Sequence, residues 1–455
     1  MRYKRYKQTN ITHIIPKNKI SQELEGISAI LDANPRIVER AYEDLTKGCN
    51  AGNGREGMTA EQVVRSAILK QYRNLNYEEL SFHLEDSNAF RAFARLGMSQ
   101  YPCDSVLQEN IKALSTETWE SINRAIICYA EEEGIEKGRT IRTDSTAVET
   151  NIHHPTDSTL LCDGVRIITR WLIEGSELRP KPRYRFSDHR RVVKKRVLAI
   201  LNSRKEEQKR QAYKELLEYA GKVAGYAEGA IPVLESYKNK DEKETQYAHE
   251  LAEKLKQALT LMKQVIDQAT RRVIQGETVP VREKMVSFFE SHTDIIVKGR
   301  RETEYGHKIF LTGGTSNLIL DCIIERGNPS DADNYKQLVE RIENIYGRVP
   351  RQVTADGGFA SKENLAWAKG KEIKDVAFSK KRGLSVLDMV KSSWVYKKLK
   401  NFRAGIEANI SALKRAFGLR RCSWSGWEGF KQYVWSAIVS YNLLVLARHK
   451  IACTS

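Results

Sequence analysis

The order of strand-like and helix-like segments, broken once by a long charged stretch, constrains the fold of this chain more than any other feature. Residues 139–149 are β-branched with alternating polar side chains, which is typical of a strand. Strand patterns return at 294–297, 306–311, 318–324, 351–355 and 375–378, and a helical pattern follows each of the last three. This order predicts a mixed α/β core between residue 139 and about residue 417.

The charged stretch at 183–284 interrupts that core after its first strand. It is dense in Lys, Arg, Glu and Gln, and two long helical patterns at about 188–225 and 238–274 are joined through residues 229–232. An antiparallel helical hairpin is the simplest interpretation. We therefore predict three parts, which are a helical N-terminal domain at 1–137, a core at 138–182 and 285–455, and a helical insertion at 183–284.

The N-terminal part is helical throughout residues 21–133. Thr59 begins one helix with a capping-box pattern, and shorter helices are expected at 77–84, 88–96 and 105–114. Short helices in series resemble a helix-turn-helix array, in which one helix enters a major groove of DNA. A small helical bundle with no role on DNA is the alternative.

The charge of the chain indicates a polyanionic partner. With 75 Lys and Arg against 58 Asp and Glu, the net charge is +17 and the pI is near 9.4. Nothing in the sequence predicts a membrane anchor, so double-stranded DNA is the expected partner, and a merely basic protein is the alternative. The densest bases open the insertion and are candidate DNA-binding residues, unless they only form a solvated face: Arg190, Arg191, Lys194 and Lys195.

Cysteine usage and the N-terminus argue for a cytoplasmic protein. The seven cysteines include no Cys-x-x-Cys pair and have no clustered histidines, which argues against a zinc site and for reduced thiols. The N-terminal residues are basic but no apolar run follows them, so no signal peptide is expected. The most apolar stretch, 433–447, is too short to span a membrane.

A helix predicted at 401–421 carries a charged border beside its apolar stripe. Ile406 and Leu413 belong to the stripe, while Arg403, Glu407 and Lys414 line one edge of it. An acid among bases at the edge of a core can be an ordinary ion pair between residues i and i+4. It can also be part of a site.

Two further acids stand at comparable places. Asp144 lies near the end of the first strand, and Asp356 follows the strand at 351–355 within Asp-Gly-Gly. Each alone is more typical of a turn or a surface. Together with Glu407, strand-end carboxylates would form a suitable set of oxygen ligands for hard divalent ions such as Mg²⁺.

These motifs resemble those of bacterial insertion-sequence transposases of the DDE superfamily. The matching segments are Thr143-Asp144-Ser-Thr, Thr354-Ala-Asp356-Gly-Gly-Phe and Arg403-x3-Glu407-x6-Lys414. The last resembles the signature Tyr-x2-Arg-x3-Glu-x6-Lys, although Lys400 occupies the tyrosine position. The resemblance implies a ribonuclease-H-like core with a five-stranded mixed sheet in the order 3-2-1-4-5.

The resemblance also implies the chemistry. Asp144, Asp356 and Glu407 would be the catalytic residues and hold two Mg²⁺ ions, for which Mn²⁺ can substitute, about 3.5–4 Å apart. Arg403 and Lys414 would contact phosphate near the scissile bond. The enzyme would bind the terminal inverted repeats of its element, cleave a strand and transfer it to target DNA. It is expected to act in the bacterial cytoplasm, on the nucleoid, as a homodimer or higher oligomer.

Two alternatives remain from the sequence. One is a catalytically silent, transposase-derived regulator that only binds DNA, and the intact set of three acids argues against it. The other is a metal-dependent nuclease that cleaves without strand transfer.

Overall fold

The computed structural model describes residue 4 and residues 18–48, 57–298, 302–380 and 382–454. The chain forms two compact units. Unit 1 comprises Met1–Asn151 and Ile296–Ser455, and unit 2 is the segment Ile152–Ile295 between them.

Unit 1 contains all the strands. They are β1 (Thr140–Glu149), β2 (Asp294–Lys298), β3 (Glu302–Gly313), β4 (Ile319–Glu325), β5 (Gln352–Ala355) and β6 (Asp375–Phe378), with β2 starting just before the boundary. Its helices are α1 (Lys19–Ala33), α2 (Pro35–Thr46), α3 (Ala60–Tyr72), α4 (Tyr77–Asp86), α5 (Asn88–Ala94), α6 (Asp104–Lys112), α7 (Thr116–Glu132), α12 (Asp331–Tyr346), η3 (Gly357–Phe359), α13 (Lys362–Gly370), α14 (Val386–Met389), α15 (Ser393–Ala416) and α16 (Trp427–Thr454).

The strands form one open mixed sheet with β1 near its centre. Its path is β2-β3-β1-β5-β6, and β4 also pairs with β3, so the five core strands follow the predicted order 3-2-1-4-5. β1 is antiparallel to β3 and parallel to β5. The mixed α/β class is thus confirmed. The expected count of five strands is corrected to six, because the short run at β2 also pairs with β3.

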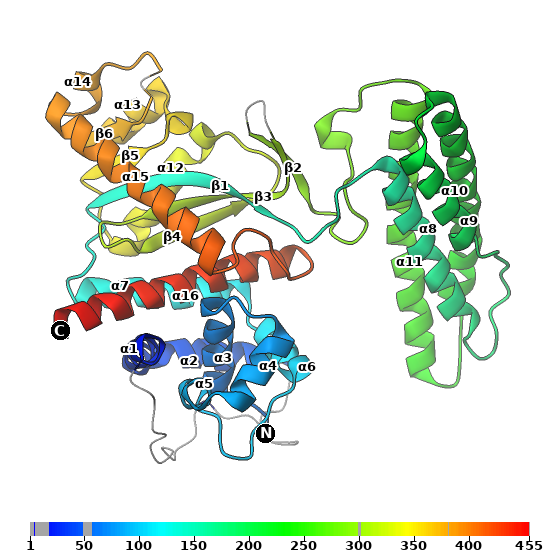
Figure 1. Ribbon diagram of the computed structural model, residues 1–455, viewed down its shortest axis with the longest axis horizontal. Coiled ribbons are helices and arrows are strands. Elements are labelled where there is room, and N and C mark those ends of the chain that lie inside the picture. The colour runs from blue at the N-terminus through cyan, green and yellow to red at the C-terminus, as the bar shows by residue number, and fades with distance from the viewer. Residues whose placement is uncertain (1–3, 5–17, 49–56, 299–301, 381, 455) are drawn as a thin grey trace. The chain divides into compact units, whose positions relative to one another are not determined.

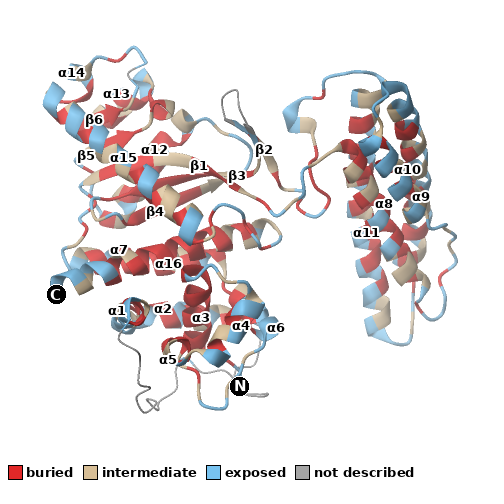
Figure 2. Ribbon diagram, viewed as in Figure 1, coloured by how far each residue is buried: buried red, intermediate tan, exposed pale blue. Residues whose placement is uncertain are grey.

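Helices cover both faces of this sheet (Figure 1). α15 packs against β1, β5 and β6, while α12 packs against β3, β4 and η3. The long helix α16 contacts β4 and is packed in turn against α1, α3 and α7. Figure 2 shows the resulting core, with buried residues on the strands and along α16. The apolar stretch 433–447 forms the middle of α16, whose residues Val434, Ile438 and Leu446 are fully buried.

The N-terminal helices share the core of the sheet rather than forming a unit of their own. A single hydrophobic cluster runs from Leu24 on α1 through α3 and α7 to the strands and to Ala447 on α16. Gly26 fits this packing closely, because a Cβ atom there would lie 2.9 Å from the Cβ of Ala447. The boundary predicted at residue 137 therefore does not separate two compact units.

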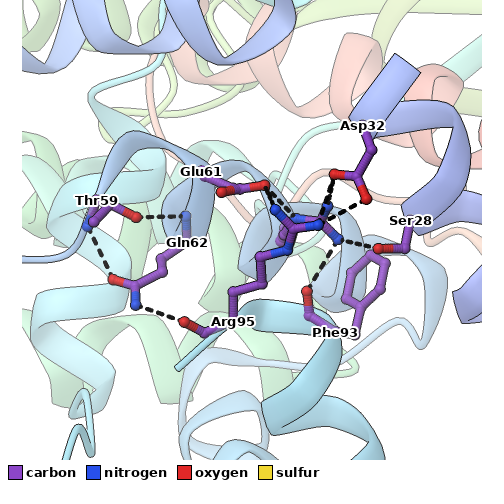
Figure 3. A network of polar contacts seen from close by, with 8 residues as sticks. Ser28, Asp32, Thr59, Glu61, Gln62, Phe93 and Arg95 are labelled. Carbon is purple, nitrogen blue, oxygen red and sulfur yellow. Dashed lines mark hydrogen bonds and ion pairs between the residues drawn. The ribbon is translucent and has the colours of Figure 1, made fainter. Parts of the chain in front are cut away.

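The helix α3 is the centre of this N-terminal region and is buried on every side. Thr59 and Gln62 form the predicted capping box. The guanidinium of Arg65 donates to Asp32 at 2.8 Å. Arg95 pairs with both Asp32 and Glu61, as Figure 3 shows. This network ties α3 to α1 and to the end of α5. A helix buried on all sides cannot enter a DNA groove.

Unit 2 is a helical bundle with a separate core. Its elements are α8 (Asp157–Ser176), α9 (Arg190–Asn202), α10 (Glu206–Glu235), α11 (Glu242–Ala269), η1 (Thr270–Ile274) and η2 (Val281–Glu283). The predicted two-helix hairpin at 183–284 is therefore corrected to four α-helices within 152–295. The hairpin prediction missed α8, whose apolar stripe packs on α10 and α11. Pro232, the expected turn, instead lies in the last turn of α10.

Candidate active site

The pairing of β1 with β5 places two of the predicted acids side by side. The strands are parallel, and Thr143 is the register partner of Ala355. Asp144 is the next residue of β1, and Asp356 is the residue that directly follows β5. Asp356 is extended and precedes the short helix η3. Residues far apart in the sequence are thus neighbours at the carboxyl end of β5.

The third acid reaches this place from α15, which crosses the same strands. Its buried residues include Val395, Leu399, Ile406 and Leu413. A Cβ atom at Gly405 would lie 1.7 Å from the guanidinium of Arg142, which donates to Phe402 O, so a glycine is required for the helix to approach β1 this closely.

The boundaries of that helix differ from the prediction of 401–421. α15 begins two turns earlier, at Ser393, where the Ser392 hydroxyl accepts from the N–H of Val395. It ends at Ala416 because Gly418 has a φ of 71°. A left-handed residue terminates an α-helix and is best supplied by glycine.

Arg403 lies at the meeting point of the three acids. Its Nη2 is 2.9 Å from Oδ2 of Asp144 and 3.5 Å from Oδ1 of Asp356, and its Nη1 is 2.9 Å from Oε1 of Glu407. One guanidinium therefore pairs with all three carboxylates. The side chains of Arg403 and Asp144 are 15% and 14% exposed, whereas Asp356 and Glu407 open to solvent at 38% and 58%.

The two aspartates differ in acidity. Burial raises the pKa of Asp144 above its ordinary value and outweighs the opposing effect of Arg403. Burial also acts to raise the pKa of Asp356, but the Ser379 hydroxyl, the Gly357 N–H and the charges of Arg403 and Lys380 hold it below its ordinary value. Burial acts to lower the pKa of Arg403, and the three carboxylates raise it. Asp356 is thus the more stable anion.

Residues after β6 support Asp356 and were missed in the sequence. The Ser379 hydroxyl donates to Oδ1 of Asp356 at 2.6 Å and accepts from the N–H of Gly357 at 2.9 Å. A Cβ atom at Gly357 would lie 2.6 Å from the Cβ of Lys380. The sequence did contain a signal for these residues. Ser379 and Lys380 directly follow the predicted strand at 375–378, and the carboxyl ends of neighbouring parallel strands meet at one edge of a sheet.

A fourth carboxylate, Asp331, holds the opposite face of β1 and had no sequence signal. Its Oδ1 accepts from the Ser145 hydroxyl at 2.9 Å and pairs with Nζ of Lys308 at 2.7 Å. A Cβ atom at Gly358 would lie only 2.1 Å from its Oδ2. Asp331 therefore contacts Ser145, next to Asp144, and Gly358, two residues after Asp356. It is not one of the three carboxylates that pair with Arg403.

The predicted DNA contacts of α15 are only partly at this cluster. Arg403 lies among the acids, and Lys414, half-buried, lies about two helical turns beyond Glu407. Lys400, at the tyrosine position of the signature, is exposed. Tyr396 does not substitute for that tyrosine, because its hydroxyl donates to Phe378 O at 2.8 Å.

The four predicted DNA contacts of unit 2 lie on α9. Arg190 is engaged with Asp188 through bonds of 2.7–3.0 Å. Arg191, Lys194 and Lys195 are exposed, as are Leu198 and Leu201 on the same helix.

The helices α3 to α7 present an acidic rather than a basic surface. Within 57–137 the exposed bases are Arg73, Arg124 and Lys137, whereas the exposed acids are Glu78, Glu79, Glu85, Asp86, Asp104, Glu109, Glu117, Glu132 and Glu133. Phosphate contact by α4 to α6 is therefore not favoured by charge. Apart from Lys4, the basic N-terminal segment falls outside the described residues.

The three acids converge on one cation in this structure, the guanidinium of Arg403. Within the described ranges, no three His, Cys, Asp or Glu side chains are arranged to hold a metal as they stand. In this structure the guanidinium of Arg403 lies between the acids. Three carboxylates that face one shared cation are nonetheless the oxygen ligands that Mg²⁺ and Mn²⁺ prefer.

Comparison with known families covers both ends of the chain. Residues 297–443 match the family described as "Transposase DDE domain", and residues 10–113 match "Transposase domain (DUF772)". Asp356, Arg403 and Glu407 lie within the first match, whereas Asp144 lies between the two. No curated protein and no solved structure matches the chain.

None of the helices in the described ranges combines the length and apolar character needed to cross a membrane. The two family matches, together with the converging acids, settle the classification. The chain belongs to the insertion-sequence transposases of the DDE type.

Proposed function

We propose that this transposase binds the terminal inverted repeats of its element, cleaves one strand at each end and joins the new 3′ end to target DNA. The observation that carries the proposal is the single guanidinium paired with Asp144, Asp356 and Glu407. Phosphodiester chemistry requires positive charge that offsets the negative charge of the phosphate. Three acids that converge on one cation can hold such a positive charge in place.

DDE transposases generally use divalent metal ions, and two Mg²⁺ ions, or Mn²⁺ in their place, are the proposed cofactors. When bound, they would neutralise the phosphate and activate the attacking water or 3′-hydroxyl. Asp144, Asp356 and Glu407 would hold them. Ser379 and Asp331 would keep the two aspartate segments in place through the contacts described above.

Arg403 has two proposed positions. It neutralises the acids when they hold no metal, and it turns to the phosphate beside the scissile bond when they do. Lys414 would contact the backbone further along the same helix. In unit 2, Arg191, Lys194 and Lys195 are the proposed phosphate contacts, because Arg190 is engaged with Asp188. The protein would act as a homodimer or higher oligomer in the cytoplasm, on the nucleoid.

A supercoiled plasmid carrying the element's own ends tests this function directly. Incubated with the protein and Mg²⁺, it should yield nicked or excised products and then joined products. Asp356→Asn should bind the ends and leave the plasmid intact, whereas Asp86→Asn, an exposed aspartate on α4, should behave as the natural protein. Active Asp356→Asn protein would overturn the site assignment.

The two rival functions give different products in the same assay. A DNA-binding regulator without catalytic activity would shift the plasmid ends in a gel but leave them uncut with either Mg²⁺ or Mn²⁺. A nuclease without strand transfer would cut the ends but give no joined product.

A further inference from the structure

We infer that the outer surface of α15 is a track for the DNA strand that leaves the active site, and that the track ends on Trp394. This inference rests on the proposed function. Four residues besides Glu407 matter: Arg403, Lys400, Lys397 and Trp394.

The spacing of these residues makes them one continuous ridge. Going toward the start of α15 from Glu407, the steps are four, three, three and three residues, and residues three or four apart are neighbours on a helix surface. Rows at spacing three wind around a helix at about 45° to its axis. The ridge therefore leads from the acids out over the solvent side: Glu407, Arg403, Lys400, Lys397, Trp394.

The side chains along the ridge are available to a ligand. Lys397 and Lys400 are exposed, and in the described part of the chain neither has an ion-pair partner. Trp394 is 70% exposed. All seven tryptophans lie in described residues, and the other six are buried or half-buried. The indole ring of Trp394 is therefore open to a stacking partner.

Charge decides that the occupant is nucleic acid. Lys398 lies over the Trp394 ring, 5.4 Å from Nζ to the centroid, and Lys391 and Arg382 are exposed nearby in the chain. Asp388 is the one acid from residue 380 to residue 406. Basic side chains beside an aromatic ring suit phosphates next to a stacked base. Figure 2 shows the exposed residues over α14 and the first turns of α15.

The length of the ridge suits a short single-stranded segment. Thirteen residues of α-helix rise about 20 Å. At the 3.4 Å per nucleotide of a fully stacked DNA strand, this rise corresponds to about six nucleotides from the cleaved phosphate. Lys400 and Lys397 would contact its phosphates, and Trp394 would stack on a base. This gives Lys400, which stands in place of the signature tyrosine, a contact of its own.

Tryptophan fluorescence tests the stacking step. The difference in emission between the natural protein and Trp394→Phe reports Trp394 alone. Titration with a mixed-sequence duplex bearing a single-stranded overhang should shield this emission from acrylamide. Shielding that instead rises with protein concentration, in the absence of DNA, would identify an interface between copies and overturn the inference.

Binding measurements test the phosphate contacts. Lys397→Ala with Lys400→Ala should make the slope of log K against log salt less steep by about 1.4, because each phosphate contact to a single strand contributes about 0.7. Trp394→Ala should bind the overhang about tenfold more weakly, and Trp394→Phe, which keeps a ring, should bind nearly as the natural protein does. Lys238→Ala with Lys240→Ala, two exposed lysines of unit 2 that are not part of α15, should leave the slope unchanged.

The outcome separates this inference from the function on which it rests. If the variants bind and cut the plasmid ends with an unchanged slope and an unshielded Trp394, the track is wrong and the transposase function stands. If the natural protein neither binds nor cuts the ends, the proposed function itself fails.

Discussion

Replacing Arg403 by glutamine should destabilise the protein without metal and make it respond more strongly to metal. Arg403 pairs with three carboxylates, of which only Asp144 is well shielded from solvent. A hydrogen bond between charged groups contributes about 1.5–3 kcal/mol, whereas pairs to exposed partners contribute about 0–1 kcal/mol. We therefore expect Arg403→Gln to lower the free energy of unfolding by about 2 kcal/mol in chelator, chiefly through Asp144.

Mn²⁺ should reverse much of this loss. A cation bound to the three acids supplies the positive charge that the variant lacks, and it no longer has to displace the guanidinium. A ligand that binds only the folded state stabilises it according to its concentration relative to Kd. The stabilisation by Mn²⁺ should therefore be larger in Arg403→Gln than in the natural protein.

Urea unfolding, followed by circular dichroism with chelator or with Mn²⁺, measures both effects. Arg415→Gln is the matched control, because Arg415 is an exposed base on the same helix and pairs with no acid among the described residues. Equal stabilisation by Mn²⁺ in the natural protein and in Arg403→Gln would refute the reasoning, since it would mean that metal and guanidinium do not compete for the same carboxylates.

Three other predictions concern the acids, their support and the insertion. The raised pKa of Asp144 means that its charge opposes folding at neutral pH; this penalty is absent below the ordinary aspartate pKa of about 3.9 and develops as the pH rises through the folded value. The lowered pKa of Asp356 has the opposite effect. It gives stability that is full above about 3.9 and is lost as the pH falls through the folded value. At neutral pH without metal, Asp144→Asn should thus be as stable as the natural protein or more so, and Asp356→Asn less stable; the reverse order in urea unfolding would contradict these shifts. Gly358→Ala should cost about 1–3 kcal/mol of stability, because it forces a Cβ atom against Asp331. Asp331→Ala should partly relieve this cost, and Gly370→Ala, where the space is open, should not show it. Equal unfolding midpoints for the natural protein and Gly358→Ala would show that the contact is not tight. Lys194→Ala with Lys195→Ala should reduce the salt slope of DNA binding by about 2, unlike the exposed pair Lys238→Ala with Lys240→Ala; an unchanged slope would make α9 a solvated face.

Local patterns in the sequence predicted the elements of the core well. Alternating β-branched residues located β1, the Asp-Gly-Gly turn located the end of β5, and Thr59 located the start of α3. The resemblance to DDE transposases supplied the strand order, which the structure confirms. These features depend on short-range backbone preferences, which a single sequence records.

Contacts between distant segments could not be predicted in the same way. The pairing of Arg403 with Glu407 is visible as an i,i+4 spacing, but its bond to Asp144 depends on how α15 crosses β1. The same holds for Asp331 at the start of α12, whose partners Ser145 and Lys308 lie on two different strands, β1 and β3. The helix α8 was missed because its apolar stripe can be recognised as a core face only once α10 and α11 are known to pack against it.

The central claim is that Asp144, Asp356 and Glu407 form one metal site. Fe²⁺ placed in that site, with ascorbate and peroxide, should cut the polypeptide near all three residues at once, and excess Mg²⁺ should suppress the three cuts together. Asp356→Asn should lose all three. Cuts near only one of the acids, or cuts near all three that Asp356→Asn leaves unchanged, would contradict a shared site.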